Sequence, residues 1–120
     1  MRFFRHDNAF CVRAEMSADA VTLKLTLEAE RVPDPYVRQV PNWPGSKPTP
    51  PERVREAVLA GAEAANRSFG TSFWPLAIEF QVEREYTATQ TLERFTREII
   101  ERLARHGTSG FEDAAGGKAR

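Results

Sequence analysis

Residues 21–30, VTLKLTLEAE, alternate apolar and polar side chains without interruption. The apolar set, which faces one way in an extended chain, is Val21, Leu23, Leu25, Leu27 and Ala29. Such a strand has one buried side and one solvated side, so a sheet built on it is covered on one face only. Residues 9–16, AFCVRAEM, alternate in the same way, with Phe10, Val12, Ala14 and Met16 on the apolar side. The two segments are predicted to pair as an antiparallel hairpin.

A third strand is predicted in residues 73–86, with Trp74, Leu76, Ile78, Phe80 and Val82 facing inward and Glu79, Gln81 and Glu83 outward. Two helices are also expected. The first covers about residues 50–68, where Thr49 and Glu52 have the spacing of a capping box and Gly70 ends the pattern. Its inner face carries mostly small residues and is expected to approach the sheet closely: Ala57, Val58, Gly61, Ala62 and Ala65. The second helix carries Leu92, Phe95, Ile99, Ile100 and Leu103 at helical spacing and stops at Gly107.

The expected order is therefore strand, strand, helix, strand, helix, which predicts an α+β two-layer sandwich with both helices on the apolar face of the sheet. A chain of 120 residues has the length of one domain with one core. We predict a single domain over residues 1–107. The polar, Gly-rich residues 108–120 are expected to be a disordered tail.

The composition of the chain limits the classes of function that we expect for this protein. Seventeen Lys and Arg balance seventeen Asp and Glu, so no global field directs the protein to nucleic acid or anionic lipid. Cys11 is the only cysteine, which excludes an internal disulfide and favours a reducing compartment. No apolar run has the length of a signal-peptide core or of a membrane span. A cytoplasmic protein without a membrane partner is predicted.

An enzyme is the weaker hypothesis. His6 and His106 are far apart in the sequence, and Cys11 lacks the neighbouring base that a nucleophile needs. The carboxylates Glu79, Glu83 and Glu85 include a same-face pair that could bind a metal, although solvated strand residues explain it more simply. None of the P-loop, GxSxG, HExxH or CxxC motifs occurs. No catalytic residue, metal or cofactor is predicted.

Residues 31–50 are rich in proline and combine three cations, Arg31, Arg38 and Lys47, with two aromatic residues, Tyr36 and Trp43. Single-stranded RNA surfaces use this mixture, with cations for phosphate and aromatic rings for bases. The alternative is that Tyr36 and Trp43 anchor a long loop to the body of the domain. This segment is the predicted partner-contact surface, together with Arg84 beside Tyr86.

Two short patterns carry a family resemblance. Pro33, Tyr36 and Val37 match P-x-x-Y-[IV], and Ala57, Val58, Gly61 and Ala65 match A-V-x-x-G-x-x-x-A. In both respects the chain resembles domain IV of elongation factor G, and the order of elements agrees from about residue 21 to residue 106. Thr87 stands where that family has a His, and the segment between Val37 and Glu52 is longer than the family needs. The resemblance thus implies the fold, a ribosomal-protein-like β-α-β sandwich, more than translocation.

Two functional hypotheses follow. The first is a non-enzymatic binding module of the translation-factor type, which contacts RNA or the ribosome through residues 31–50. The second is a protein-interaction or self-associating module that uses the exposed sheet face or the same loop. The zero net charge favours the second hypothesis, and the family resemblance favours the first.

Overall fold

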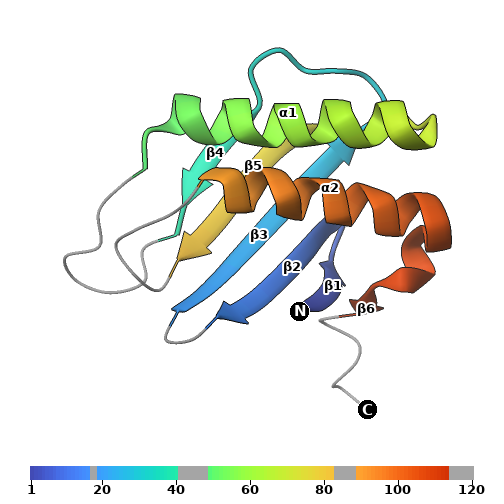
Figure 1. Cartoon of the computed structure of the whole chain (residues 1–120), viewed down its shortest axis with the longest axis horizontal. Coiled ribbons are helices and arrows are strands. Elements are labelled where there is room, and N and C mark those ends of the chain that lie inside the picture. The colour runs from blue at the N-terminus through green and yellow to red at the C-terminus, as the bar shows by residue number, and fades with distance from the viewer. Residues whose placement is uncertain (17–18, 41–48, 83–88, 114–120) are drawn as a thin grey trace.

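The structure is a computed structural model that describes residues 1–16, 19–40, 49–82 and 89–113. Its two layers are a mixed sheet and a pair of helices that lie side by side across one face (Figure 1). The strands are β1 (Arg2–His6), β2 (Ala9–Met16), β3 (Asp19–Glu28), β4 (Tyr36–Gln39), β5 (Trp74–Val82) and β6 (Glu112–Asp113). The helices are α1 (Pro51–Phe69) and α2 (Thr89–His106). The predicted α+β sandwich is confirmed, and its five predicted elements correspond to β2, β3, α1, β5 and α2.

The strands lie in the order β4-β5-β3-β2-β1-β6. The four inner strands pair antiparallel, whereas β4 is parallel to β5 and β6 is parallel to β1. The predicted hairpin is confirmed, with Phe10 opposite Leu25 and Ala14 opposite Val21. Helix α1 connects β4 to β5, because parallel neighbours need a crossover connection.

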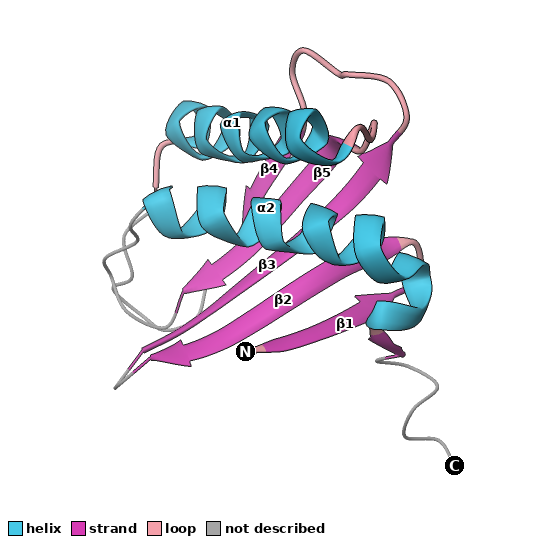
Figure 2. Cartoon of the chain, turned by 45° about the vertical axis from the view of Figure 1, so that its right-hand side comes forward, coloured by secondary structure: helices cyan, strands magenta, loops and turns pink. Residues whose placement is uncertain are grey.

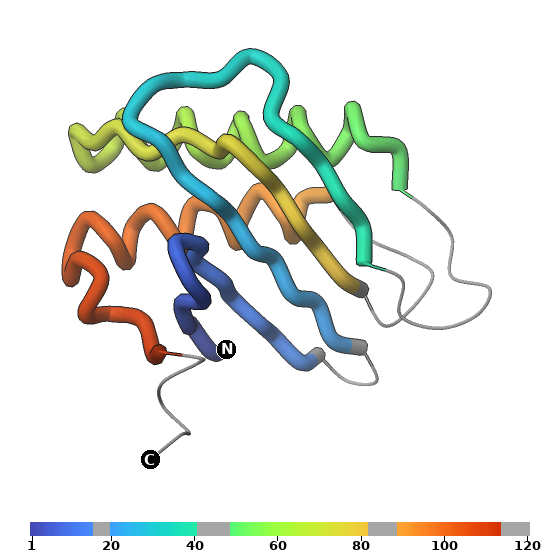
Figure 3. The backbone as a smooth tube through the Cα atoms, turned by 180° about the vertical axis from the view of Figure 1, so that it is seen from behind, coloured from blue at the N-terminus to red at the C-terminus, as the bar shows by residue number. Residues whose placement is uncertain are grey.

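The core lies between the helices and one face of the sheet (Figure 2). Residues that the sequence pattern places in this core are buried: Val12, Leu25, Val58, Ala65, Phe80, Phe95, Ile99 and Leu103. Seen from behind, the sheet lies in front of both helices and neither helix crosses the face toward the viewer (Figure 3). The sheet therefore has the one helix-free face that the alternation of residues 21–30 predicts.

The small residues of α1 serve its contact with α2 rather than with the sheet. A Cβ on Gly61 would lie 2.4 Å from the backbone oxygen of Glu93 and 3.1 Å from the Cβ of Thr96, both on α2. Ala62 and Ala65 likewise form a buried cluster with Ile100 of α2. The prediction that these small residues bring α1 close to the sheet is therefore wrong. A stripe of small apolar residues does not reveal which neighbouring element packs against it.

Helix α1 begins one residue later than the capping-box prediction requires. Its N-cap is Pro50, with ψ of 127° and no side-chain cap. A proline disfavours helical conformation in the residue before it, so Pro51 keeps Pro50 extended. The backbone N–H of Thr49 instead donates to Oε1 of Gln39 at 2.8 Å. The predicted Thr49 cap is therefore wrong, because Thr49 lies outside the helix.

Strand β5 contains an irregularity that reverses part of the predicted pattern. Thr26 pairs with Ala77, but the next residue, Leu27, pairs with Pro75, so Leu76 is an extra residue on β5. Leu76 is 40% exposed and not inward as predicted. Ile78 and Phe80, beyond the irregularity, are buried as predicted. The side chains of Met16 and Val82, and the whole of Glu83, lie outside the described part of the chain.

Both ends of the described chain contain structure that the sequence analysis did not predict. Strand β1 precedes a two-residue turn in which Asp7 has a φ of 57°. At the other end, a 3-10 helix (Gly107–Gly110) leads to Phe111, which is 6% exposed and lies against the rings of Phe3 and Phe10. The predicted disordered tail is therefore wrong for residues 108–113, because one buried aromatic residue holds this polar segment. Residues 114–120 lie outside the described part.

The Pro-rich segment also contains a strand, β4, where the sequence analysis expected a long loop. No proline occurs within Tyr36–Gln39, so each of its backbone N–H groups can take part in a ladder. Arg55 of α1 fixes the approach to this strand. Its Nε donates to the oxygen of Pro35 at 2.8 Å and lies 3.3 Å from Oδ1 of Asp34.

Candidate functional site

The helix-free face of the sheet, called the open face below, brings together chemical groups from five strands. Strand pairing places Arg38 (β4), Glu79 (β5), Lys24 (β3), Cys11 (β2) and Phe4 (β1) in one row across it. Paired residues project to the same side of a sheet, so all five share this face. A cation, a carboxylate, a second cation, a thiol and an aromatic ring thus follow one another from β4 to β1.

Two hollows lie along this row. One has a volume of about 120 Å³ and is lined by Lys24, Thr26, Tyr36, Arg38, Ala77, Ile78 and Glu79. The other has about 160 Å³ and includes Phe4, His6, Cys11, Thr22, Lys24, Val40 and Glu79 among its lining residues. Lys24 and Glu79 border both. Pockets that enclose a small-molecule ligand have volumes of about 300–1,000 Å³. Both hollows are smaller than that, so they suit a partner that lies across the surface and not a ligand that the domain encloses.

Tyr36 is the most exposed aromatic residue that the structure describes on the open face, with 65% of its surface accessible. It lies two residues before Arg38 on β4, so both side chains project to the same side. The alternative in which Tyr36 anchors the segment to the core does not fit this exposure. Tyr36 contributes little to the core and remains available to a partner.

Arg38 and Glu79 form an ion pair, with 3.3 Å between Nη1 and Oε1. The Arg38 side chain is about half exposed and that of Glu79 about one third, so the pair contributes little to stability. The geometry of the pair matters more. A hydrogen-bond donor and an acceptor lie side by side at the border of the 120 Å³ hollow, which is called the Tyr36 hollow below.

Positive and negative side chains balance on the open face. Among the described strand residues, its cations are Arg2, Arg13, Lys24 and Arg38, and its carboxylates are Glu15, Glu28, Glu79 and Glu112, which leaves no net charge. Several of these groups neutralise one another, such as Arg2 and Glu112 at 3.1 Å. The whole chain is neutral as well.

Cys11 lies at the centre of the open face but is only 2% exposed. Burial raises the pKa of its thiol to about 11, while the charge of Lys24 opposes this rise and that of Glu79 adds to it. The thiol is therefore protonated at neutral pH. A protonated, buried thiol is a poor nucleophile, so Cys11 is a packing residue.

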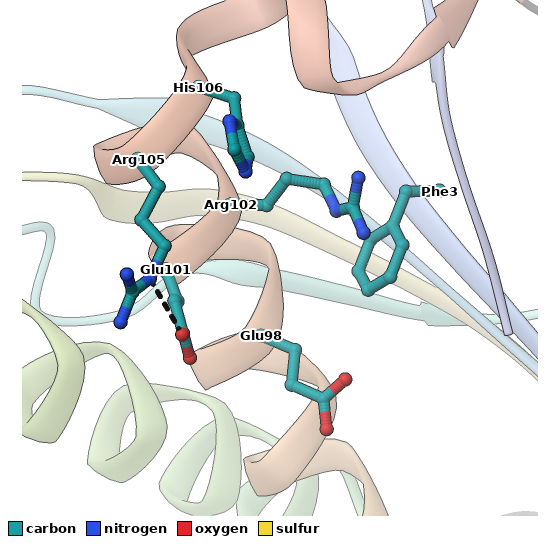
Figure 4. Close-up of a pocket in the computed structure, with 6 residues that line it drawn as sticks. All are labelled: Phe3, Glu98, Glu101, Arg102, Arg105 and His106. Atoms are coloured by element: carbon teal, nitrogen blue, oxygen red, sulfur yellow. Dashed lines mark hydrogen bonds and ion pairs between the residues drawn. The ribbon is translucent and has the colours of Figure 1, made fainter.

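A larger hollow of about 320 Å³ lies on α2 beside Phe3 of β1 (Figure 4). Its charged residues interact mainly with each other and with the body of the domain. Arg102 lies 4.0 Å from the centre of the Phe3 ring and donates to the oxygen of Gly110 at 3.0 Å, and Nε of Arg105 lies 2.9 Å from Oε2 of Glu101. These contacts attach the C-terminal segment to the sheet. Arg105 and His106 lie in the last turn of α2, where a positive charge interacts favourably with the helix dipole.

Of the predicted contact residues, the structure places Tyr36 and Arg38 together at one hollow. Arg31 lies elsewhere, with its guanidinium 4.9 Å from the centre of the Trp74 ring. Trp43, Lys47, Arg84 and Tyr86 lie outside the described residues. The sequence analysis did not select Lys24, Glu79 or Phe4 as contact residues. Each of them lies on a different strand, so the sequence of any one strand does not show that they are neighbours. Only the pairing of the strands shows it.

The fold and this site define a class of molecule, a two-layer α+β domain with one helix-free sheet face that carries aromatic and charged side chains. Comparisons with models of protein families, with curated proteins and with solved structures found no match. Among the described residues, no three His, Cys, Asp or Glu side chains are grouped as metal ligands. Neither helix in that part of the chain is long and apolar enough to span a bilayer.

Proposed function

We propose that this domain is a non-enzymatic module that binds single-stranded RNA on its open face. The observation that carries the proposal is Tyr36, an aromatic ring that is 65% exposed beside Arg38 and Lys24 at a shallow hollow. Base stacking on such a ring contributes about 1–3 kcal/mol per base, and neighbouring cations contact the phosphates. The resemblance to domain IV of elongation factor G points to ribosomal RNA as the source of the strand.

The second hollow extends the same surface. It includes Phe4, a half-buried aromatic side chain, and shares Lys24 with the first hollow. A strand that stacks one base on Tyr36 can therefore continue toward Phe4, with Lys24 between the two positions. Sheet-based RNA modules likewise stack two or three bases on aromatic side chains of the sheet.

A salt-dependent titration tests the proposal. A fluorescently labelled RNA of about 12 nucleotides is titrated with the protein at several salt concentrations. Each phosphate contact should contribute about −0.7 to the slope of log affinity against log salt. Lys24→Ala should flatten the slope by about that amount, and Tyr36→Ala should weaken binding by about 1–3 kcal/mol. Tyr36→Phe, which keeps the ring, should bind like the unmodified protein.

Arg97→Ala is the matched control, because Arg97 is an exposed cation on α2, in the other layer of the domain. It should leave the affinity unchanged. A protein that fails to bind RNA at low salt, or loses as much affinity through Arg97→Ala as through Lys24→Ala, would refute the proposal.

A protein partner is the second candidate function, and two observations favour it. The described residues of the open face have no net charge, and β4 is an end strand to which another chain could add. Strand addition relies on backbone hydrogen bonds, so Tyr36→Ala would weaken it little and salt would affect it less than RNA binding. Absence of RNA binding together with concentration-dependent self-association would favour this candidate.

A further inference from the structure

A row of small side chains crosses the open face between Tyr36 and His6. From β4 to β1, strand pairing orders this row as Tyr36, Ala77, Thr26, Ala9 and His6. Paired residues project to the same side of a sheet, so the two larger side chains stand at opposite ends of three short ones. Neighbouring strands lie about 4.8 Å apart, so the row spans about 19 Å. A single strand of RNA that stacks on Tyr36 can therefore cross the sheet over the short side chains and reach His6.

The two ends of this row border the two hollows of the open face. Tyr36 lines the Tyr36 hollow, and His6 lines the hollow of about 160 Å³ together with Phe4 and Lys24. His6 lies two residues after Phe4 on β1, so both side chains project to the open face. About half of the His6 side chain is exposed to solvent. An RNA strand that continues from Tyr36 toward Phe4 therefore meets an accessible imidazole at the second stacking position.

Charged groups of both signs surround the His6 imidazole. Oδ2 of Asp7, in the turn after β1, lies 3.5 Å from Nδ1 of His6, but most of the Asp7 side chain is exposed, so water screens its charge. The other charged or titratable groups on the surrounding strands are Lys24 and Glu79, which pair across β3 and β5, Arg2 and Glu112, which form an ion pair, and the uncharged thiol of Cys11. The opposite charges within each pair largely cancel.

Protonation of an imidazole changes what it offers to a phosphate. Histidine side chains gain their positive charge within the range from about pH 8 to about pH 5. A neutral imidazole has one N–H donor, whereas the protonated ring has two donors and a positive charge. Hydrogen bonds between a charged donor and a phosphate are the stronger kind. Because the described strand residues of the open face have no net charge, one added proton makes their total charge positive.

We infer that His6 is a phosphate-contact residue of the RNA site and acts in its protonated form, so the open face binds RNA more tightly at mildly acidic pH. The inference rests on the proposed RNA-binding function and names the regulation of that same site by pH. Its sign follows from linkage, since a phosphate that favours the protonated ring must itself bind more tightly when the ring is protonated. One phosphate contact steepens the salt slope by about 0.7, which corresponds to about fivefold in affinity at about 0.1 M salt.

Titration of the full chain with oligouridine at two pH values tests this inference. The RNA has about 12 nucleotides, hydroxyl ends and a label whose emission does not depend on pH. Its phosphodiesters and uracil bases do not titrate between about pH 8 and about pH 5.5, the range in which a histidine gains its charge. The unmodified protein should bind about fivefold more tightly at the lower pH in about 0.1 M salt, with a salt slope steeper by about 0.7.

Two substitutions at His6 separate its charge from its shape. His6→Gln keeps a polar side chain but gains no charge, so its affinity should be the same at both pH values and equal to that of the unmodified protein at about pH 8. His6→Lys carries a charge throughout, so it should bind tightly at both pH values. Circular dichroism at each pH shows whether the variants remain folded.

His106→Gln is the matched control. His106 is the only other histidine of the chain and is exposed at the end of α2, in the other layer of the domain. This variant should keep the full pH dependence of the unmodified protein.

The outcomes separate this inference from the proposed function. Binding of RNA with equal affinity at both pH values would overturn the inference and leave RNA binding intact. A pH dependence that survives in folded His6→Gln, or that His106→Gln abolishes, would overturn the role of His6. If His6→Lys binds no better than His6→Gln, a positive charge at this position does not contact the strand. No binding of RNA at either pH would refute the proposed function itself, and the inference with it.

Discussion

Gly61→Ala is expected to destabilise the domain, although Ala normally favours a helix over Gly. The new Cβ would lie 2.4 Å from the backbone oxygen of Glu93 and 3.1 Å from the Cβ of Thr96. Favourable contacts between heavy atoms lie near 3.5 Å, so α1 and α2 must separate locally by about 1 Å. The closer obstacle is a backbone atom, and no side-chain rotation can remove it.

The magnitude follows from two opposing effects. Overpacking of a well-packed interior costs about 1–3 kcal/mol, and a backbone obstacle belongs near the upper end of that range. Replacing a mid-helix Gly by Ala returns about 1 kcal/mol through helix propensity. We therefore expect the free energy of unfolding to fall by about 2 kcal/mol.

Urea unfolding followed by circular dichroism measures this change, provided that the slope against urea is the same in both proteins. Ala60→Gly is the matched control, because Ala60 is exposed on the same helix and lies next to Gly61. It should cost about 1 kcal/mol through propensity alone. If Gly61→Ala were as stable as the unmodified protein while Ala60→Gly behaved as expected, the close contact of α1 with α2 would be refuted.

Three further predictions concern stability. Asn66→Ala should cost about 2–3 kcal/mol in urea unfolding, because the buried Asn66 amide donates to the oxygen of Phe73 and accepts from its N–H, both at 3.0 Å. A loss below about 0.5 kcal/mol would mean that those hydrogen bonds are replaced by water. Phe111→Ala should cost about 3–5 kcal/mol, whereas a cost near zero would support a disordered C-terminal segment after all. The pKa of the Cys11 thiol is raised to about 11 from 9.0, so the unfolded thiol ionises first and stability should fall as pH rises from about 9 to about 11. Cys11→Ala should lack this fall, and an identical pH profile in both proteins would contradict the assignment.

The sequence predicted the elements whose pattern repeats within a short stretch. The hairpin of β2 and β3 followed from alternation, and α2 followed from the spacing of Leu92, Phe95 and Ile99. Elements stabilised by a single distant contact were missed. Strand β1 and the segment around Phe111 support each other across the two ends of the chain, so neither shows a pattern on its own.

Part of the candidate site was predicted and part was not. Tyr36 and Arg38 were selected from the Pro-rich segment because aromatic and cationic residues alternate there. Glu79 and Lys24 lie on the polar sides of two separate strands in the sequence pattern, and neither was selected as a contact residue. Their place beside Arg38 depends on which strands pair and in which register, and that information is absent from either strand alone.

The amino-acid sequence by itself determined the one-sided sheet, the two helices that cover it and the burial of their apolar faces. It did so because the period of apolar residues matches the period of the backbone within each element. Tertiary structure alone decided that Arg38 would lie beside Glu79, that Gly61 would meet α2, and that Leu76 would face outward. These outcomes depend on register and on the distance between elements, which are set when the whole core packs and not by any one segment.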